Sequence, residues 1–297
     1  MTPAAAPGGR LVVCPTPIGN LEDVTLRVLA TLREADVVAC EDTRHTRVLL
    51  ERHGLGHAAA KLLSYHEHNE RARARELVER MRAGDLVALV SDAGMPLVSD
   101  PGFALVRASI EAGLAVEVLP GPSAVSTARV ASGLPNEHWR FVGFLPRKAA
   151  ERGRLLERAA ETLVAFESPR RLAATLAQLA ERDPDRPLAV CRELTKLHEE
   201  VRRGTAAELA EYYTEHAPRG EVVLVVGAAG LDPDRPAGST RGEVLDPRSG
   251  EAVGALRELV DAGARARPAA KVVAKLTGAS ANDLYRRLTD KSRREGG

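Results

Sequence analysis

Carboxylates and arginines follow two of the short apolar runs in this chain. Glu41, Asp42 and Arg44 stand at the end of one run, and Asp92 and Asp100 lie in a loop, residues 91–102, that holds two Gly, two Pro and two Asp. Carboxylates held by a stiff loop can accept hydrogen bonds from an amine or from ribose hydroxyls, or face a positive sulfonium. The planar guanidinium of Arg44 suits a phosphate or a carboxylate. The pattern indicates a binding site for a polar ligand.

Three further loops carry unusual residues. Residues 15–21 contain two prolines and one glycine, so the chain there is stiff and can approach a ligand closely. Residues 120–124 form a turn of Pro, Gly and Ser, and Arg170 and Arg171 follow Ser168-Pro169. Simpler interpretations also exist. Residues 15–21 could be a plain turn, Asp100 could only cap a helix that begins at Pro101, and the acids at 41–42 could only interact with a helix dipole.

The elements that must position these loops alternate between short apolar runs and longer helical segments from residue 10 to about 227, which is typical of βαβ units. Strands are expected at 11–14, 36–40, 61–65, 86–91 and 116–119, then at 140–145, 163–167, 188–192, 200–203 and 221–226. Helices are expected at 24–33, 43–53, 69–82, 101–112, 123–131, 169–181 and 205–215. In such open sheets, ligands collect at the carboxyl ends of the strands, which is where these loops lie.

The chain is long enough for more than one domain. We expect a disordered tail at 1–9, an α/β domain at 10–121, a second α/β domain at 122–228, a linker at 229–250 and a small helical domain at 251–297. Three short helices are expected in the last part, at 251–262, 267–276 and 280–291. From residue 265 onward, nine Lys or Arg against three Asp or Glu make the end of the chain basic, although the whole chain carries only +1.

Composition excludes several classes of protein. Three cysteines without a Cys-x-x-Cys motif favour neither a disulfide framework nor a zinc site, and His66 with His68 lacks a spaced third ligand, so no metal is expected. No basic and apolar leader or run of about 20 apolar residues is present, and we therefore expect a cytoplasmic protein that does not enter a membrane. Residues 54–59 match G-x-G-x-x-A but follow a helix and precede a strand, the reverse of a dinucleotide site.

The sequence resembles the ribosomal small subunit RNA methyltransferase I family, within the tetrapyrrole-methylase-like, class III S-adenosylmethionine methyltransferases. The resemblance rests on PTPIGNLEDVTLR, EDTR, VSDAGMPLVSDPG, LPGPSA, FESPRR and CRELTKLHEE, in that order between residues 11 and 227. It implies two α/β domains with the cofactor cleft between them, a homodimer, and 2'-O-methylation of a cytidine in the decoding region of 16S ribosomal RNA. One departure is Met95, where the family often has a small polar residue.

The resemblance also implies site residues. S-adenosyl-L-methionine would contact Pro17, Asp92, Gly94, Pro96, Ser99, Asp100, Pro122, Ser123 and Ala124, with Glu167, Gly220 and Glu221 across the cleft. A ribose hydroxyl must lose its proton to a nearby carboxylate or to a water polarised by a lysine, so the catalytic candidates are Asp42, Asp100 and Lys196. Substrate contacts are expected from Glu41, Arg44, Arg170, Arg171, Arg286 and Arg287, the last two on the basic C-terminal helix, which could equally be a solubilising tail.

Two other functions stay open at this stage. The chain could methylate a tetrapyrrole or another small molecule, against which the basic C-terminal extension argues. It could also be a non-catalytic RNA-binding or ribosome-assembly protein, against which the intact cofactor loops argue.

Overall fold

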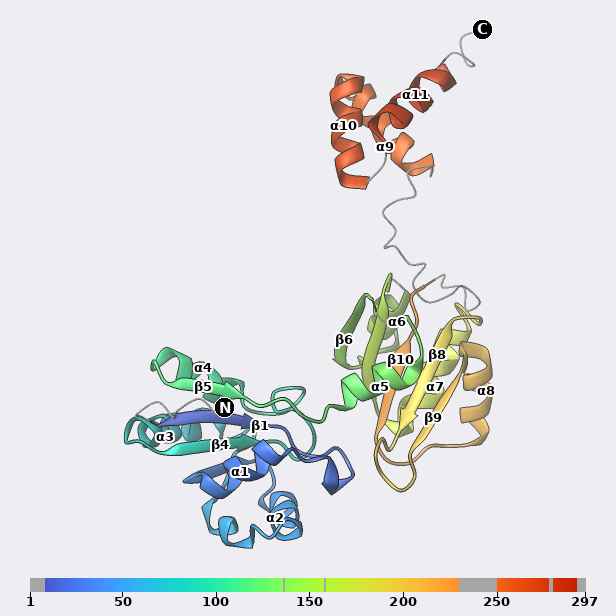
Figure 1. Cartoon of the computed structure of the whole chain (residues 1–297). Coiled ribbons are helices and arrows are strands. Elements are labelled where there is room, and N and C mark those ends of the chain that lie inside the picture. Colours follow the sequence, from blue (N-terminus) through green and yellow to red (C-terminus); the bar gives the residue numbers. More distant parts are fainter. Residues whose placement is uncertain (1–8, 136, 158, 230–249, 278–279, 293–297) are drawn as a thin grey trace. The chain divides into compact units, whose positions relative to one another are not determined.

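The computed structural model describes residues 9–135, 137–157, 159–229, 250–277 and 280–292 (Figure 1). The chain divides into two compact units, Met1–Pro233 and Asp234–Gly297. Most of the expected tail at 1–9 and linker at 229–250 lies outside the described residues, and the expected domain boundary near residue 121 stays a prediction.

The first sheet is entirely parallel, with strand order β3-β2-β4-β1-β5. Its strands are β1 (Arg10–Cys14), β2 (Val37–Cys40), β3 (Leu62–Ser64), β4 (Leu86–Val90) and β5 (Ala115–Val118). Its helices are α1 (Leu26–Glu34), α2 (Thr43–Arg52), α3 (Glu70–Arg82) and α4 (Phe103–Glu111), with short 3-10 helices at Leu21–Asp23 and Gly56–Lys61. The G-x-G-x-x-A segment lies between α2 and β3, as its sequence context predicted.

Strands β1, β2 and β4 of this sheet are buried on both faces, which explains why their sequences read as continuous apolar runs. Alternate residues of β1 point to opposite faces, so Val12 packs in a core that contains residues of α1 and α2. Leu11 and Val13 pack in a second core with residues of α3 and α4. The carboxyl ends of all five strands therefore meet at one edge, where the loops with polar residues begin.

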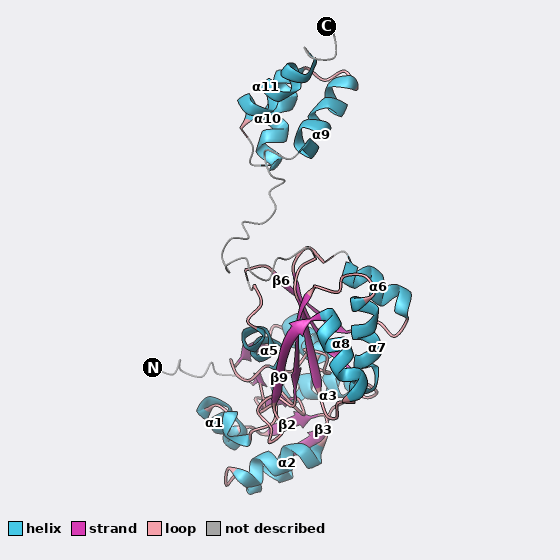
Figure 2. Ribbon diagram, turned by 90° about the vertical axis from the view of Figure 1, so that its right-hand side faces the viewer, coloured by secondary structure: helices cyan, strands magenta, loops and turns pink. Residues whose placement is uncertain are grey.

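The second sheet has the order β6-β7-β10-β8-β9 and is mixed: only β6 and β7 run parallel. Its strands are β6 (Trp139–Phe144), β7 (Thr162–Glu167), β8 (Pro187–Arg192), β9 (Glu200–Thr205) and β10 (Val222–Val226). Its helices are α5 (Ala124–Ser132), α6 (Ala149–Glu157), α7 (Pro169–Ala180) and α8 (Ala206–Glu215) (Figure 2). The antiparallel pairs are β10 with β7, β10 with β8 and β8 with β9, none of which is connected by a single helix, so the βαβ pattern did not reveal them.

Strand β10 shows how this sheet is buried on both faces. Val222, Leu224 and Val226 pack with residues of α6, α7 and α8. Val223 and Val225 pack with residues of α5, and the same core includes Ile18 from the loop after β1. Loop residues that belong to the first sheet thus contribute to the core of the second.

Two helices differ from the sequence prediction. Helix α6 was not predicted, and Gly153 in its middle weakens the local signal, but a side chain there would begin 2.8 Å from Nη1 of Arg182, so the glycine permits close packing. Helix α4 begins at Phe103 rather than Pro101, and its N-cap is Gly102, with φ of 136° and no capping side chain. The prediction that Asp100 caps this helix was therefore wrong, because the left-handed backbone at Gly102 delays the helix start beyond Asp100.

The C-terminal unit contains α9 (Gly250–Asp261), α10 (Ala266–Thr277) and α11 (Ala281–Ser292). Its small core is made by alanines and larger aliphatic residues, namely Ala252, Leu256, Ala269, Ala270, Val273 and Leu284. Within the described ranges of the chain, no helix is both long and apolar enough to cross a membrane.

Candidate functional site

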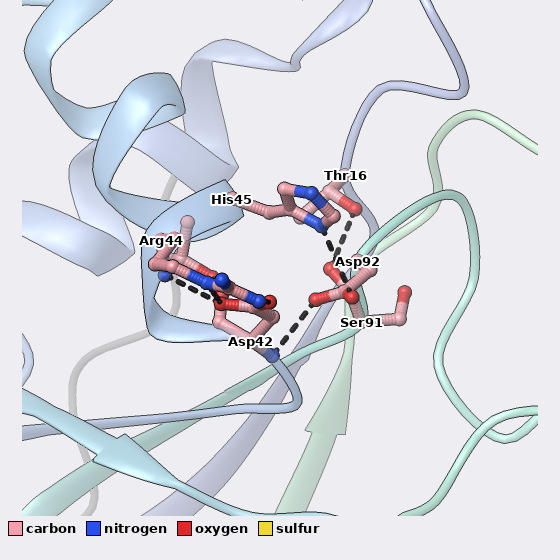
Figure 3. Close-up of polar contacts among 7 residues, drawn as sticks. Thr16, Asp42, Arg44, His45, Ser91 and Asp92 are labelled. Carbon is pink, nitrogen blue, oxygen red and sulfur yellow. Dashed lines mark hydrogen bonds and ion pairs between the residues drawn. The ribbon is translucent and has the colours of Figure 1, made fainter.

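Three hydrogen bonds join two of the loops at the carboxyl edge of the first sheet, and a fourth lies within the second of these loops; Figure 3 shows the bond between Thr16 and Ser91. The backbones of Thr16 and Gly94 exchange two hydrogen bonds of 2.9 Å. The hydroxyl of Thr16 donates to the carbonyl of Ser91, and the hydroxyl of Ser91 donates to that of Gly94, each at 2.9 Å. The loops after β1 and β4 consequently form one rigid structure.

The turn after β5 packs against the same structure. A side chain at Gly121 would begin 2.7 Å from Cγ of Pro15, and one at Gly94 would begin 3.2 Å from Ile18. These glycines allow three loops to approach closely. The structure brings the predicted residues of the three loops together; Pro17 and Pro96 are buried and shape the loops, whereas Ser99 is exposed and Pro122 partly exposed.

Left-handed backbone at residues other than glycine occurs in two loops of the described chain. Leu97 and Ser99 have φ of 70° in the loop after β4, and Glu193 and Thr195 have φ of 49° and 65° in the loop between β8 and β9. Such conformations cost about 1–3 kcal/mol each and collect at functional sites. Both loops carry predicted catalytic residues.

A hydrogen-bonded acidic group lies at the ends of β2 and β4 (Figure 3). Oδ1 of Asp92 accepts a 2.9 Å hydrogen bond from the backbone N–H of Asp42, and Oδ2 lies 3.2 Å from Nδ1 of His45. Asp42 caps α2 through the N–H of Arg44 and also pairs with its guanidinium, Nη2 to Oδ2 being 2.5 Å. Asp92 therefore ties together the two loops from which the acids project.

The carboxylates of this group differ in acidity. Burial, followed by repulsion from Glu41 and Asp92, raises the pKa of Asp100 to about 7. Burial first, and then Asp92, also raises the pKa of Glu41. Hydrogen bonds from Arg44 hold the pKa of Asp42 well below its usual range. Of the two predicted acid candidates, only Asp100 has the proton affinity of a general base near neutral pH.

Lys196, the third catalytic candidate, lies in the loop between β8 and β9 and contacts the loop after β1. Its Nζ donates to Oε1 of Glu193 at 3.0 Å and to Oε2 of Glu221 at 2.9 Å. These hydrogen bonds outweigh burial, so the pKa of Lys196 is raised and the amine stays charged. Lys196 is thus suited to hold an anionic oxygen and not to accept a proton.

Glu167, predicted beside the cofactor, is buried at the end of β7 and hydrogen-bonded to residues of α7 and the segment before it. Its carboxylate accepts hydrogen bonds from the N–H of Ser168 at 2.6 Å and the hydroxyl of Thr175 at 2.7 Å. It also pairs with Arg171 at 2.5 Å, and Arg171 donates to the carbonyl of Leu145. The structure therefore directs Arg171 inward, while Arg170 is exposed.

The remaining predicted residues lie at the start of α5, in the turn before β10 and on α11. Ser123 caps α5, and Ala124 is the first residue of that helix. Gly220 and Glu221 are exposed beside Glu193, and Gly220 has φ of 84°. Arg286 and Arg287 are exposed on α11 in the C-terminal unit.

Sequence reasoning did not single out Thr16, His45, Glu193 and Thr195. His45 had a signal, because it stands three residues after Asp42 at a helix start. The others act through partners far along the chain: the N–H of Asn20 donates to Oγ1 of Thr195 at 3.0 Å, across 175 residues. Only tertiary structure reveals such pairs.

This donor set fits a cationic nucleoside ligand of the kind that the resemblance implies. Acceptors dominate at the carboxyl edge of the first sheet, and carboxylates suit ribose hydroxyls, an amine and a positive sulfur. A Cβ at residue 121 would overlap Pro15 and one at residue 94 would crowd Ile18, so the two glycines allow the loops to pack closely. In the described part of the chain, no group of three or more His, Cys, Asp or Glu is arranged to hold a metal ion.

Comparison with known proteins agrees with this arrangement. Residues 10–210 match the family model of the tetrapyrrole (corrin/porphyrin) methylases. A ribosomal RNA small subunit methyltransferase I of Mesorhizobium japonicum is 45% identical over 94% of this chain and 91% of its own length. One of Halalkalibacterium halodurans is 42% identical over 93% of both chains. One of Thermotoga maritima is 43% identical over 98% of its own length but only 73% of this chain.

Solved structures show the same fold. A uroporphyrin-III-C-methyltransferase from Thermus thermophilus is 27% identical, with a TM-score of 0.52 over 74% of this chain and 94% of that chain. The methyltransferase CobJ is 24% identical, with a TM-score of 0.57 over 74% and 95%. The predicted fold class, two α/β sheets followed by C-terminal helices, is confirmed. The near full-length similarity places this chain in the ribosomal RNA small subunit methyltransferase I family, within the tetrapyrrole methylases.

Proposed function

We propose that this chain uses S-adenosyl-L-methionine to methylate the ribose 2'-hydroxyl of a cytidine in the decoding region of 16S ribosomal RNA. The observation that carries the proposal is the 42–45% identity, over nearly the whole chain, to ribosomal RNA small subunit methyltransferases I. The carboxylates at the edge of the first sheet supply the acceptors that such a cofactor needs.

In this proposal the loop after β4 and the turn after β5 hold the cofactor, through Asp92, Gly94, Ser99 and Asp100 and through residues 122–124. The cofactor supplies a methyl group bound to a positively charged sulfur. The Asp100 carboxylate takes the proton of the ribose hydroxyl, because burial keeps its proton affinity near that required at neutral pH. Asp92 and Glu41 maintain that affinity by their charge.

Lys196 and the exposed arginines hold the RNA. Lys196 stays protonated, so its ammonium can donate to a phosphate or ribose oxygen, while Arg44 and Arg170 lie at the surface, where phosphate groups can reach them. Holding the acceptor oxygen in line with the methyl group is the larger part of the catalysis, since orientation alone can lower a barrier by about 7–11 kcal/mol.

The proposal is tested with purified protein, labelled cofactor and 30S subunits from a strain that lacks the endogenous enzyme. Nuclease digestion and mass spectrometry should locate one new 2'-O-methylcytidine in the decoding region. Transfer to the base of the nucleotide, or to a tetrapyrrole offered in its place, would contradict the proposal. Failure of the protein to bind the cofactor in a calorimetric titration would favour a non-catalytic assembly protein.

The C-terminal unit is proposed to anchor the RNA. Arg286 and Arg287 are exposed on α11, and Arg265, Arg267 and Lys271 are exposed at or near α10. The relative from Thermotoga maritima has no counterpart for about a quarter of this chain. A member of this family therefore exists without that part. Replacing Arg286 and Arg287 by Ala should weaken RNA binding and lower the slope of its salt dependence by about one for each phosphate that an arginine had bound. Cofactor affinity should not change.

We further propose that two copies of the chain form a dimer through the region of α4 and β5. Strand β5 is an edge of the first sheet, and the large apolar side chains Phe103, Ile110 and Val118 are 70%, 60% and 58% exposed there. A second copy would cover them and the unpaired strand edge. Light scattering should give a mass of two chains, and Ile110→Asp should reduce it to one; a monomeric wild type would contradict the proposal.

A further inference from the structure

The loop between β8 and β9 holds Lys196 against the loop that follows β1. The site of Gly19 leaves no room for a side chain, because a Cβ there would overlap Cγ of Lys196 and lie 2.7 Å from Oγ1 of Thr195. The N–H of the next residue, Asn20, donates to Oγ1 of Thr195 at 3.0 Å. The aliphatic stem of Lys196 therefore lies on bare backbone, and the direction of its ammonium depends on what holds Nζ.

Glu193 is the side chain best placed to hold it. Its Oε1 accepts a 3.0 Å hydrogen bond from Nζ of Lys196 and a 2.9 Å hydrogen bond from the N–H of Glu221. The N–H of Glu193 in turn donates to the carbonyl of Glu221 at 3.0 Å. A side chain at Gly220 would overlap the Glu193 carboxylate, so a glycine is required there. Glu193 is thus fixed by backbone before it contacts Lys196.

Glu221 accepts from the same ammonium at 2.9 Å, but from a more exposed position. Its side chain is 73% exposed, whereas that of Glu193 is 19% exposed. Exposed ion pairs contribute little, since water screens them and two flexible chains must be ordered. Lys196 has three N–H donors, of which Glu193 and Glu221 take two within the described structure, so one donor remains for an incoming oxygen and Glu221 can be displaced.

The backbone of this loop is strained by the arrangement. Glu193 and Thr195 adopt left-handed φ values of 49° and 65°, an unfavourable conformation for these residues. The N–H of Thr195 donates to the carboxylate of Glu199 at 2.6 Å, which closes the loop. Strain of this kind persists only where surrounding contacts enforce it, and here those contacts direct one ammonium group.

We propose that Glu193 is a positioning residue, which holds the Lys196 ammonium beside residues 15–20 so that it can donate to an oxygen of the RNA. The inference rests on the proposed function for its consequence, but its geometry can be tested without RNA or cofactor. In this proposal Glu193 and the contact at Gly19 act only through Lys196.

The first experiment measures how fast an amine-selective reagent modifies Lys196 in the full-length protein, by mass spectrometry across pH 7–10. Glu193→Gln keeps the size of the side chain and an oxygen that can accept from the N–H of Glu221. It removes the negative charge that favours the ammonium form of Lys196. Modification of Lys196 should become faster by more than about twofold, because loss of the neighbouring negative charge favours the neutral, reactive amine. Glu151→Gln is the matched control, because Glu151 pairs with Lys148 at the same i,i+3 spacing, at 3.2 Å, on an exposed surface.

The second experiment displaces Lys196 from the other side. Gly19→Ala inserts a methyl group into the lysine stem and should also change the modification rate of Lys196. Gly56→Ala is its control, since the nearest atom to a Cβ there, Cγ of Glu51, is 4.0 Å away. With 30S subunits, both Glu193→Gln and Gly19→Ala should lower kcat on the order of tenfold to a hundredfold with the cofactor KM unchanged, as misplacement of a catalytic contact predicts.

A modification rate in Glu193→Gln within twofold of the wild type, with the fold intact by circular dichroism, would overturn the proposal. So would a faster modification accompanied by unchanged kcat, because Lys196 would then be held without consequence for the reaction. If the wild-type protein transfers no methyl group to RNA, the proposed function fails, and the modification rates still decide whether Glu193 holds Lys196.

Discussion

The protonation of Asp100 makes the proposed reaction dependent on pH in a way that can be calculated. Burial, and then the charges of Glu41 and Asp92, raise its pKa to about 7. A general base works only when ionised, so kcat/KM should rise with pH and level off above neutrality. With a pKa of about 7, about one-eleventh of the carboxyl is ionised at pH 6 and about ten-elevenths at pH 8. The rate should therefore rise about tenfold between these pH values.

Three variants separate Asp100 from its neighbours. Asp100→Asn should lower kcat/KM by about 10²- to 10⁴-fold and remove the rise with pH. Glu41→Gln removes a repelling charge, so the midpoint of the rise should move to lower pH. His45→Gln is the control, since Nδ1 of His45 lies 3.2 Å from Oδ2 of Asp92. It should keep the rise.

The assay is methyl transfer from labelled cofactor to 30S subunits at subsaturating substrate, in buffers of constant ionic strength from pH 5.5 to 9. A profile of Asp100→Asn that retains the wild-type midpoint would refute Asp100 as the base. A wild-type rate that is flat between pH 6 and 8 would refute the reasoning that burial and like charges set its proton affinity.

Three further outcomes are expected. The raised pKa of Asp100 stabilises the folded protein below about pH 4, and this contribution is lost as the pH rises through about 7. Asp100→Asn should therefore raise the Tm at pH 8 more than at pH 5, as measured by calorimetry. Thr175→Val removes a donor to the buried Glu167 carboxylate and should destabilise by about 1.5–3 kcal/mol in urea titrations; an unchanged stability would indicate an alternative donor. Burial raises the pKa of Cys14 to about 12 and of Cys191 to about 11, so neither thiol of the native protein should react with iodoacetamide at pH 8 within minutes, as judged by mass spectrometry.

The positions of the strands and of nearly all helices along the chain could be predicted from the sequence, because apolar periodicity is a local property. Ten strands were expected and all ten form, with ends within two residues. The family followed from motifs such as VSDAGMPLVSDPG, which are local too. Helix α6 was missed because Gly153 interrupts its helical pattern. This glycine permits close packing against Arg182 and Gln178.

The roles of individual side chains were decided only by the tertiary structure. Asp42, Asp100 and Lys196 were equal candidates in the sequence, yet hydrogen bonds from Arg44 make Asp42 a weak base and burial makes Asp100 a stronger one. Glu193 and Glu221 stand 28 residues apart and meet around Lys196 through a turn at Gly220. Proton affinity and hydrogen bonding depend on burial and on partners distant in the chain. The spacing of residues in the sequence determines neither of them.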